Sequence, residues 1–259
     1  MSVRLPSHED ALAGARAQFA LLAEAVAGLP DDAFANPTRL EGWNVAALAA
    51  HVARTGATVT GRVERGTTGK PERDVLDYLS GMRALADEVA GRAVELGAAR
   101  TPAELRDDVA AGAAALAGLD APLTLSVPGY DGTLALGDFL VSRCVEGVVH
   151  GLDLAAATGV PERPDPTALK VCVRILAALA ERAAPGKAVE VRVPGHVAFQ
   201  CVTGPKHTRG TPGNVVECDP VAFVEVASGR TTWDAAVARG AIRGSGGRAD
   251  LSEWMPVIG

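Results

Sequence analysis

The sequence predicts an α plus α+β protein, with a helical bundle over residues 1–160 and a small α+β domain over residues 161–259. Up to residue 160, apolar residues recur at helical spacing in long segments. Beyond it, short segments rich in β-branched residues alternate as strands do. The proline-rich stretch GVPERPDP lies between the two patterns and is typical of a linker.

Composition limits the classes of protein to which the chain can belong. Its 259 residues suffice for two ordinary domains, and 48 % hydrophobic against 22 % charged residues is the balance of a folded protein. A formal net charge of −6, without a run of Lys or Arg, predicts no nucleic-acid partner. No segment has the ~20 continuous apolar residues that span a bilayer, and the N-terminus lacks the apolar core of a signal peptide. We therefore expect no membrane insertion and a cytoplasmic location.

Helical segments follow one another through the first part of the chain. Gly28 ends the first, Asn44 is placed to cap the second, Pro71 opens the third, and Gly159 closes the last. We expect the four longer helices to form the bundle, and the stretch between the last two helices to be a turn-rich connection. The predicted helices span residues 8–28, 45–63, 71–97 and 136–158, with a shorter one at 102–119.

The second part of the chain mixes helices with short strands, as an α+β domain does. Two neighbouring β-branched segments separated by a glycine predict a hairpin. The predicted elements are a helix at 167–184, strands at 187–195, 196–204 and 214–219, and helices at 219–228 and 231–239.

The cysteines and tryptophans have no pattern that indicates a function. The four cysteines form no Cys-x-x-Cys pair and lie in apolar contexts, so reduced, buried thiols are expected. A disulfide between Cys201 and Cys218 is the alternative. Because only 4 % of residues are aromatic, Trp43, Trp233 and Trp254 are expected to anchor the core or the junction between the two parts.

A line of polar residues runs along the last predicted helix of the bundle. Arg143, Glu146, His150 and Asp153 recur three or four residues apart and share one helix face. Such a stripe is most often the solvated side of an amphipathic helix. The alternative is that Glu146 and His150 direct two ligand atoms at one site, where a carboxylate and an imidazole suit zinc or another first-row divalent ion. His51, among apolar residues of the second helix, is the candidate for a third ligand.

Two segments together resemble a known family. LEGWNVAALAAHVART and, about ninety residues later, SRCVEGVVHGLDLAAATG are similar to the mycothiol-dependent maleylpyruvate isomerase family within the DinB-like four-helix metalloproteins. The shared pattern is a Gly-Trp before a helix with one His, and a later helix with Glu-x-x-x-His and Gly-x-Asp. The resemblance covers residues 8 to 160. It implies a DinB-like four-helix bundle in which His51, Glu146 and His150 bind the metal, with a position open to water or a thiolate.

The same resemblance implies a reaction class. Mycothiol, a low-molecular-weight thiol, would be the nucleophile, and the protein would be an isomerase or an S-transferase acting on a small anionic substrate. A hydrolase that uses metal-bound water is a further possibility, and it differs in needing no thiol. The substrate itself and the oligomeric state are not indicated by the sequence.

The C-terminal segment SGRTTWDAAVARGAIRGSGGRADLSEWMPV resembles the closing part of sterol-carrier-like domains. The stretch VTGPKHTRGTPGNVVECDP is similar to actinobacterial proteins of that family. This second resemblance implies a function of another class, in which the domain binds a lipid or another small molecule and the bundle is a scaffold. That reading predicts an apolar cavity between the strands and the final helices.

Further charged residues are candidates for the surroundings of the metal or for substrate binding. Asp153 could accept the far N–H of a ligand histidine or pair with an arginine, and Arg143 could hold Glu146 or a substrate carboxylate. Taken singly, most such charges are ordinary surface charges. As a group, however, four charged residues are candidates for binding the substrate or the thiol. Three lie in a loop bounded by glycine and proline, and the fourth lies beside the Gly-rich segment GSGG: Lys206, His207, Arg209 and Arg243.

Overall fold

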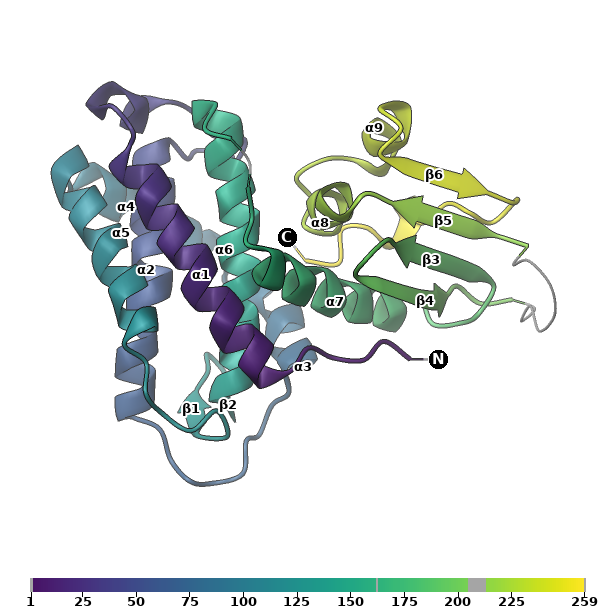
Figure 1. The fold of residues 1–259 in the computed structure, drawn as a ribbon, viewed down its shortest axis with the longest axis horizontal. Helices are drawn as coiled ribbons and strands as arrows, with labels where there is room; N and C mark the ends of the chain where they lie inside the picture. Colours follow the sequence, from purple (N-terminus) through teal and green to yellow (C-terminus); the bar gives the residue numbers. More distant parts are fainter. Residues whose placement is uncertain (1, 162, 205–212, 259) are drawn as a thin grey trace. The chain divides into compact units, whose positions relative to one another are not determined.

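A computed structural model describes residues 2–161, 163–204 and 213–258 of the chain. The chain divides into two compact units, Ser7–Val171 and a second unit made of Met1–Pro6 and Cys172–Gly259. The first unit is helical and the second combines a sheet with helices (Figure 1), which confirms the predicted α plus α+β class. The domain boundary at residue 160 stays a prediction.

The helices of the first unit lie close to the positions that the sequence predicts. Asn44 accepts a hydrogen bond from the Ala47 N–H, Thr101 and Glu104 form a capping box, and Gly159 ends its helix with φ +74°. Each of these contacts joins residues only a few positions apart, so the sequence alone predicts where these helices begin and end. The helices are α1 (His8–Ala27), α2 (Val45–Glu64), α3 (Val75–Gly81), α4 (Ala86–Ala98), α5 (Pro102–Ala117) and α6 (Leu136–Thr158), with a short 3-10 helix at Asp31–Ala35.

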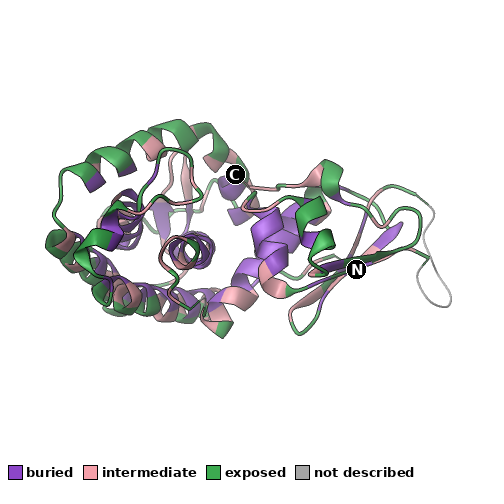
Figure 2. Ribbon diagram, turned by 90° about the horizontal axis from the view of Figure 1, so that it is seen from above, coloured by how far each residue is buried: buried purple, intermediate pink, exposed green. Residues whose placement is uncertain are grey.

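The bundle is built from α1, α2, α5 and α6, with α5 and α6 each packed against both α1 and α2. The expectation that the segment 71–97 is the fourth bundle helix is wrong, because α4 packs on α2 from outside this ring and α5 takes the place in it. Gly56 and Gly112 permit this: a Cβ on Gly56 would lie 2.7 Å from the Gly112 carbonyl oxygen. Seen from above, the buried stretches of the first unit's helices gather toward its inside, and the exposed stretches lie mainly along its outer edge (Figure 2).

The segment 71–97 is also not one helix. It is interrupted by a 3-10 turn at Met82–Leu85, between α3 and α4. In a continuous α-helix the Met82 N–H would reach the Tyr78 carbonyl. Here the Tyr130 hydroxyl donates to the Tyr78 carbonyl at 2.8 Å, and the Met82 N–H turns to Leu79 instead. A residue distant in sequence therefore sets this break.

The connection before α6 contains more regular structure than predicted. Strands β1 (Ser126–Pro128) and β2 (Thr133–Ala135) pair as an antiparallel hairpin. Gly132 has φ +140° at the turn, and the Gly129 N–H donates to the Gly132 carbonyl. Val127 and Leu134, which face each other across the hairpin, are fully buried, so packing stabilises a segment too short to form strands alone.

The backbone contact between α2 and α5 leads to a prediction about stability. Gly56→Ala should destabilise the protein by about 1–3 kcal/mol, because the methyl group would be forced against backbone atoms that cannot move aside as a side chain can. Gly91→Ala in α4 is the matched control, since its Cβ would meet nothing within 4 Å. It should stabilise the protein by about 0.5–1 kcal/mol through helix propensity. Urea unfolding of both variants tests this, and equal effects would contradict it.

A histidine links the first turns of α1 and α6. His8 Nε2 lies 3.0 Å from Asp138 Oδ1, and this hydrogen bond raises the pKa of His8. The pair therefore stabilises the fold below the unfolded-state pKa of histidine, and this contribution is lost as pH rises through the raised folded-state pKa. Since both side chains are partly exposed, we expect less than about 1 kcal/mol.

The test compares the free energy of unfolding of wild type and His8→Gln across this pH range. The wild type should be the more stable protein at about pH 5.5, and the difference should shrink by about pH 8.5. A difference that grows with pH would contradict the pairing.

The second unit contains the predicted strands in a four-stranded sheet of order β4-β3-β5-β6, in which β4 is Val197–Cys201, β3 is Val189–Val193, β5 is Val215–Cys218 and β6 is Ile242–Ser245. The predicted hairpin of β3 and β4 is antiparallel, β5 runs parallel to β3, and β6 closes the other edge antiparallel to β5. One face of the sheet is apolar, with Val191, Phe199 and Val216 buried, and Phe199 contacts Phe223 of α8. The other elements are α7 (Pro166–Ala183), which crosses the division between the units, α8 (Pro220–Ala227), α9 (Trp233–Ala238) and a 3-10 turn at Ser252–Trp254.

All four cysteines are free and buried, as the sequence predicts, and the alternative disulfide between Cys201 and Cys218 is wrong. Burial raises the pKa of the Cys172 thiol strongly, and it raises the pKa of Cys201 and of Cys218 to about 12. These three thiols are therefore protonated and weak nucleophiles near neutral pH. Among the described residues, no helix is both long and apolar enough to cross a membrane.

Candidate metal centre

The loop before α2 folds back on itself through side-chain and backbone hydrogen bonds. The Trp43 carbonyl accepts hydrogen bonds from the Thr38 N–H at 2.9 Å and the Thr38 hydroxyl at 3.0 Å. Gly42 has φ +76° at the turn, a conformation that favours glycine, and Asn44 then begins α2. This loop fixes the positions of Arg39 and Trp43 beside the bundle.

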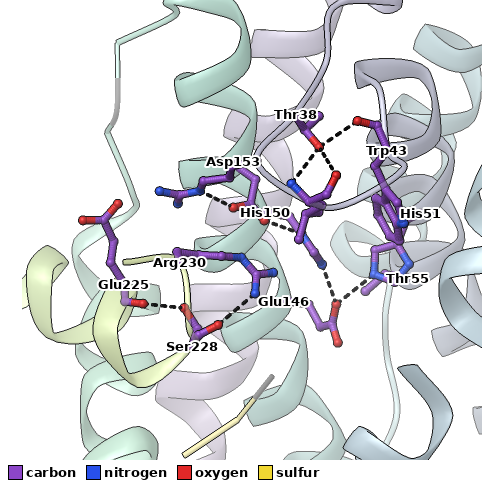
Figure 3. Close-up of polar contacts among 12 residues, drawn as sticks. Thr38, Trp43, His51, Thr55, Glu146, His150, Asp153, Glu225, Ser228 and Arg230 are labelled. Atoms are coloured by element: carbon purple, nitrogen blue, oxygen red, sulfur yellow. Dashed lines mark hydrogen bonds and ion pairs between the residues drawn. The ribbon is translucent and has the colours of Figure 1, made fainter. Parts of the chain in front are cut away.

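Three side chains from two helices converge within the bundle (Figure 3). His51 comes from α2, and Glu146 and His150 come from α6, one helical turn apart. Oε2 of Glu146 lies 2.9 Å from His51 Nε2 and 3.3 Å from His150 Nε2. One potential ligand atom from each residue lies within 4.8 Å of the other two. The stripe on α6 therefore faces α2, and its interpretation as a solvated surface is wrong.

The cluster combines an anionic carboxylate with two histidines whose pKa values are shifted in opposite directions. Burial alone would raise the pKa of Glu146, but hydrogen bonds with His150 and His51 outweigh it and hold that pKa well below its ordinary value. Burial lowers the pKa of His51. Burial also acts to lower the pKa of His150, but hydrogen bonds with Asp153 and Glu146 raise it overall. A proton and a metal ion would therefore compete for His150 as pH falls.

Asp153 orients the ring of His150 through Nδ1, the ring nitrogen that does not face Glu146. Its side chain is fully buried, its Oδ2 lies 3.0 Å from His150 Nδ1, and its Oδ1 accepts a hydrogen bond from Arg39 Nε at 2.7 Å. The two roles considered for Asp153, partner of a histidine and partner of an arginine, are thus both present. The contact engages Nδ1 of His150 and leaves Nε2 directed toward Glu146, which is the arrangement that orients a histidine ligand in metal proteins.

The donor set fits a divalent metal ion. Two imidazoles and one carboxylate are a common zinc ligand set that leaves a coordination position open. The fit is complete for His150, whose far nitrogen is bound by Asp153. It is less complete for His51, whose buried Nδ1 has no hydrogen-bond partner in the described part of the chain. Thr55 Oγ1 lies 3.4 Å from His51 Nε2, the nitrogen that faces Glu146, and not beside Nδ1.

Trp43 packs directly on the cluster, which sequence reasoning did not anticipate. Its ring centroid lies 5.3 Å from that of His51 and 6.1 Å from that of His150, nearly parallel to the latter at 18°. Trp43 is buried, as expected of a core residue, but the residues it covers are the two histidines. Arg39 was not identified either. The Gly-Trp before the helix was the available signal, since it belongs to the pattern shared with the isomerase family.

Arg143, on the same stripe, does not bind Glu146 in the structure. Its Nη1 donates to the Thr55 carbonyl at 3.2 Å, and its Nε and Nη2 donate to the Ser142 hydroxyl. Within the ranges that the structure describes, no carboxylate lies within ion-pair distance of Arg143. This leaves the other role considered for it, a contact with a substrate carboxylate, as a prediction.

The structure does not test the second group of predicted residues. Lys206, His207 and Arg209 lie outside the described residues. Arg243 is an exposed residue of β6 in the second unit, opposite Glu217 of β5. Their role in binding a substrate or thiol stays a prediction.

Fold and centre together define a class: a four-helix bundle with a buried His–Glu–His cluster that could hold a metal ion, joined to a small α+β domain. The family model described as mycothiol maleylpyruvate isomerase N-terminal domain matches residues 15–155, and the model described as bacterial SCP ortholog matches residues 165–257. The chain belongs to the mycothiol maleylpyruvate isomerase family and carries a C-terminal domain of the sterol-carrier type. The predicted resemblances are confirmed.

Solved structures with the same fold align with 95 % of the chain. A mycothiol-dependent maleylpyruvate isomerase is 19 % identical, with a TM-score of 0.55 over 95 % of this chain and 96 % of that one. A histidine-to-alanine variant of a mycothiol-dependent maleylpyruvate isomerase aligns with 18 % identity and a TM-score of 0.54, with the same coverage. No curated protein sequence matches the chain.

Proposed function

We propose that the protein is a metal-dependent and mycothiol-dependent isomerase or S-transferase that acts on a small anionic substrate. His51, Glu146 and His150 would hold one divalent ion, and zinc is the ion that this ligand set favours. The observation that carries the proposal is the convergence of these three side chains inside the bundle of a mycothiol maleylpyruvate isomerase family member. We also propose residues 1–160 as the metal-binding domain and 161–259 as the sterol-carrier-like domain.

The chain's own residues prepare the centre for this role. Asp153 holds His150 through Nδ1, Arg39 fixes Asp153, and Trp43 covers both histidine rings. Glu146 keeps its negative charge, because two hydrogen bonds stabilise the carboxylate. A divalent ion, when bound, lowers the pKa of an adjacent thiol or water molecule. The pre-formed arrangement would limit the reorganisation needed on binding.

The thiol would come from a co-substrate. Cys172, Cys201 and Cys218 are buried and have raised pKa values, so none of them is suited to attack a substrate. Mycothiol is the thiol that the family membership suggests. Addition of its sulfur to a conjugated double bond, rotation and elimination would give an isomerase, whereas retention of the sulfur would give a transferase.

The test combines metal analysis with thiol binding, because neither requires the substrate to be known. Protein purified without a histidine tag should contain one metal ion per chain and bind mycothiol in a calorimetric titration, whereas His51→Ala should do neither. Wild-type protein without stoichiometric metal under metal-replete conditions would overturn the proposal. Metal-dependent turnover of maleylpyruvate or related acids that is indifferent to mycothiol would favour the hydrolase. Apolar-ligand binding that survives His51→Ala, in a protein that binds no metal, would favour the scaffold reading.

A further inference from the structure

Arg143 is a buried cation with only neutral partners. The residue is 6 % exposed, and the hydrogen bonds of its guanidinium go to the Thr55 carbonyl and the Ser142 hydroxyl. The guanidinium carbon lies 4.4 Å from the centre of the Phe139 ring. A buried charge is costly unless an opposite charge neutralises it, so this arrangement is incomplete without an anion.

Two arginines of α2 extend this positive region. The guanidinium carbon of Arg62 lies 4.6 Å from the centre of the same Phe139 ring. Arg62 donates to the Pro128 carbonyl through Nη1, and its buried Nε has no partner in the described part of the chain. Burial and the neighbouring positive charges, Arg143 among them, lower the pKa of Arg62 and of Arg54. Arg54 is half-buried and two helical turns before Arg62.

Carboxylates of the first unit do not neutralise this cluster. Asp153 is bound by Arg39 and His150, and Asp131 by Arg73. Glu146 faces the two histidines, and Glu88 of α4 acts on Arg54 only at longer range. As far as the structure describes the chain, no ion pair is formed by Arg54, Arg62 or Arg143.

The cluster is adjacent to the candidate metal centre. Thr55 connects the two, since its carbonyl accepts from Arg143 and its hydroxyl lies 3.4 Å from His51 Nε2. Arg143 also precedes Glu146 by three residues on one face of α6. A ligand that reaches the centre would therefore place its charged group within reach of the guanidinium groups.

We infer that Arg54, Arg62 and Arg143 form a binding site for a carboxylate group of the substrate, beside the centre of His51, Glu146 and His150. Guanidinium groups bind carboxylates through paired, charge-assisted hydrogen bonds, and the Phe139 ring holds two of them in place. The inference rests on the proposed function for the identity of the ligand as a small acid, and it adds which residues of the chain bind the carboxylate. Arg143 and Arg54 are the residues that discriminate it from neutral compounds.

The experiment measures binding of maleate, fumarate and the neutral dimethyl maleate by calorimetry, with metal-loaded and metal-free protein. Wild type should bind the two dicarboxylates and not the ester. Arg143→Gln and Arg54→Gln should each weaken binding by about 10- to 100-fold, because a hydrogen-bonded charge is lost. Arg83→Gln, which removes an exposed arginine, is the matched control and should bind as wild type does. Metal content, mycothiol binding and circular dichroism of every variant show whether the centre and fold are intact.

The outcomes separate this inference from the proposed function. Dicarboxylate binding that is unchanged in both arginine variants, or absent from wild type, overturns the inference even where metal and mycothiol bind. Absence of metal and mycothiol binding overturns the proposed function. Arginine-dependent dicarboxylate binding would still support the anion site in that case, since the guanidinium groups are present without the ion. Competition of mycothiol with maleate at Arg143 would assign the anion site to the thiol rather than to the substrate, and would overturn the inference.

Discussion

Replacing His51 with alanine should remove stoichiometric metal binding. His51 supplies the only ligand atom that α2 contributes to the cluster, and the two remaining ligands on α6 are fewer than the three that a catalytic zinc ion requires. The loss of affinity should exceed the ~10- to 100-fold that follows loss of an outer partner of a metal ligand. Metal content after dialysis and a competition titration with a chromophoric chelator measure the effect.

Removing this side chain should not unfold the protein. The substitution leaves Glu146 with His150 as a partner and removes a ring whose Nδ1 has no partner among the described residues. His196→Ala is the matched control, because that exposed histidine lies in the turn between β3 and β4, and its ring lies 3.0 Å from the neighbouring Pro194 carbonyl. Equal metal content in wild type and His51→Ala would exclude His51 as a ligand.

Replacing Asp153 with asparagine should weaken both stability and metal affinity. The carboxylate is fully buried between Arg39 and His150, at 2.7 Å and 3.0 Å. Asparagine has almost the same shape but no charge, so the Arg39 guanidinium loses the charge of this partner. Only the Asp153 end of the pair is buried, since the Arg39 side chain is 24 % exposed, so the substitution should cost about 1–3 kcal/mol in the free energy of unfolding. Metal affinity should fall by about 10- to 100-fold, because a neutral amide accepts a weaker hydrogen bond from His150 Nδ1 than a carboxylate does.

Chemical denaturation and metal titration of the same protein measure the two effects. Asp131→Asn is the matched control, since its pair with Arg73 is about half-exposed and should be worth less than about 1 kcal/mol. The double variant Arg39→Gln with Asp153→Asn should lose less stability than the sum of the two single variants, because both single variants remove the same ion pair, and its metal affinity should be no higher than that of Asp153→Asn. A fully stable Asp153→Asn protein with unchanged metal affinity would contradict this role.

Helix positions were predictable because their signals are local. Asn44 caps α2 and Gly159 ends α6 through contacts with residues no more than a few positions away. The break between α3 and α4 was not predictable in this way. It depends on the Tyr130 hydroxyl, which reaches Tyr78 from a hairpin that is distant in the sequence. Nor could helix length alone assign α5 to the bundle, since the contact of Gly56 with Gly112 decides its place.

The candidate centre shows the same division. Spacing places Glu146 and His150 on one face of a helix but favours solvent for that face. Its apolar context makes His51 a candidate for the third ligand, and the resemblance to a family implies that all three bind the metal. The sequence also indicates Asp153, because it lies three residues after His150 on the same helix face. Arg39 and Trp43 were missed because they come from a loop whose course depends on hydrogen bonds between Thr38 and Trp43 rather than on periodicity.

The sequence by itself determined which segments are helical, which residues could bind a metal and that the chain has two parts, since propensity, capping and residue chemistry are properties of neighbours along the chain. Only the tertiary structure decided that the polar face of α6 points at α2. It also decided that Trp43 covers the histidines and that Arg62 and Arg143 pack on the same Phe139 ring. These facts depend on which helices pack together, and that choice is made by close packing between residues far apart in sequence.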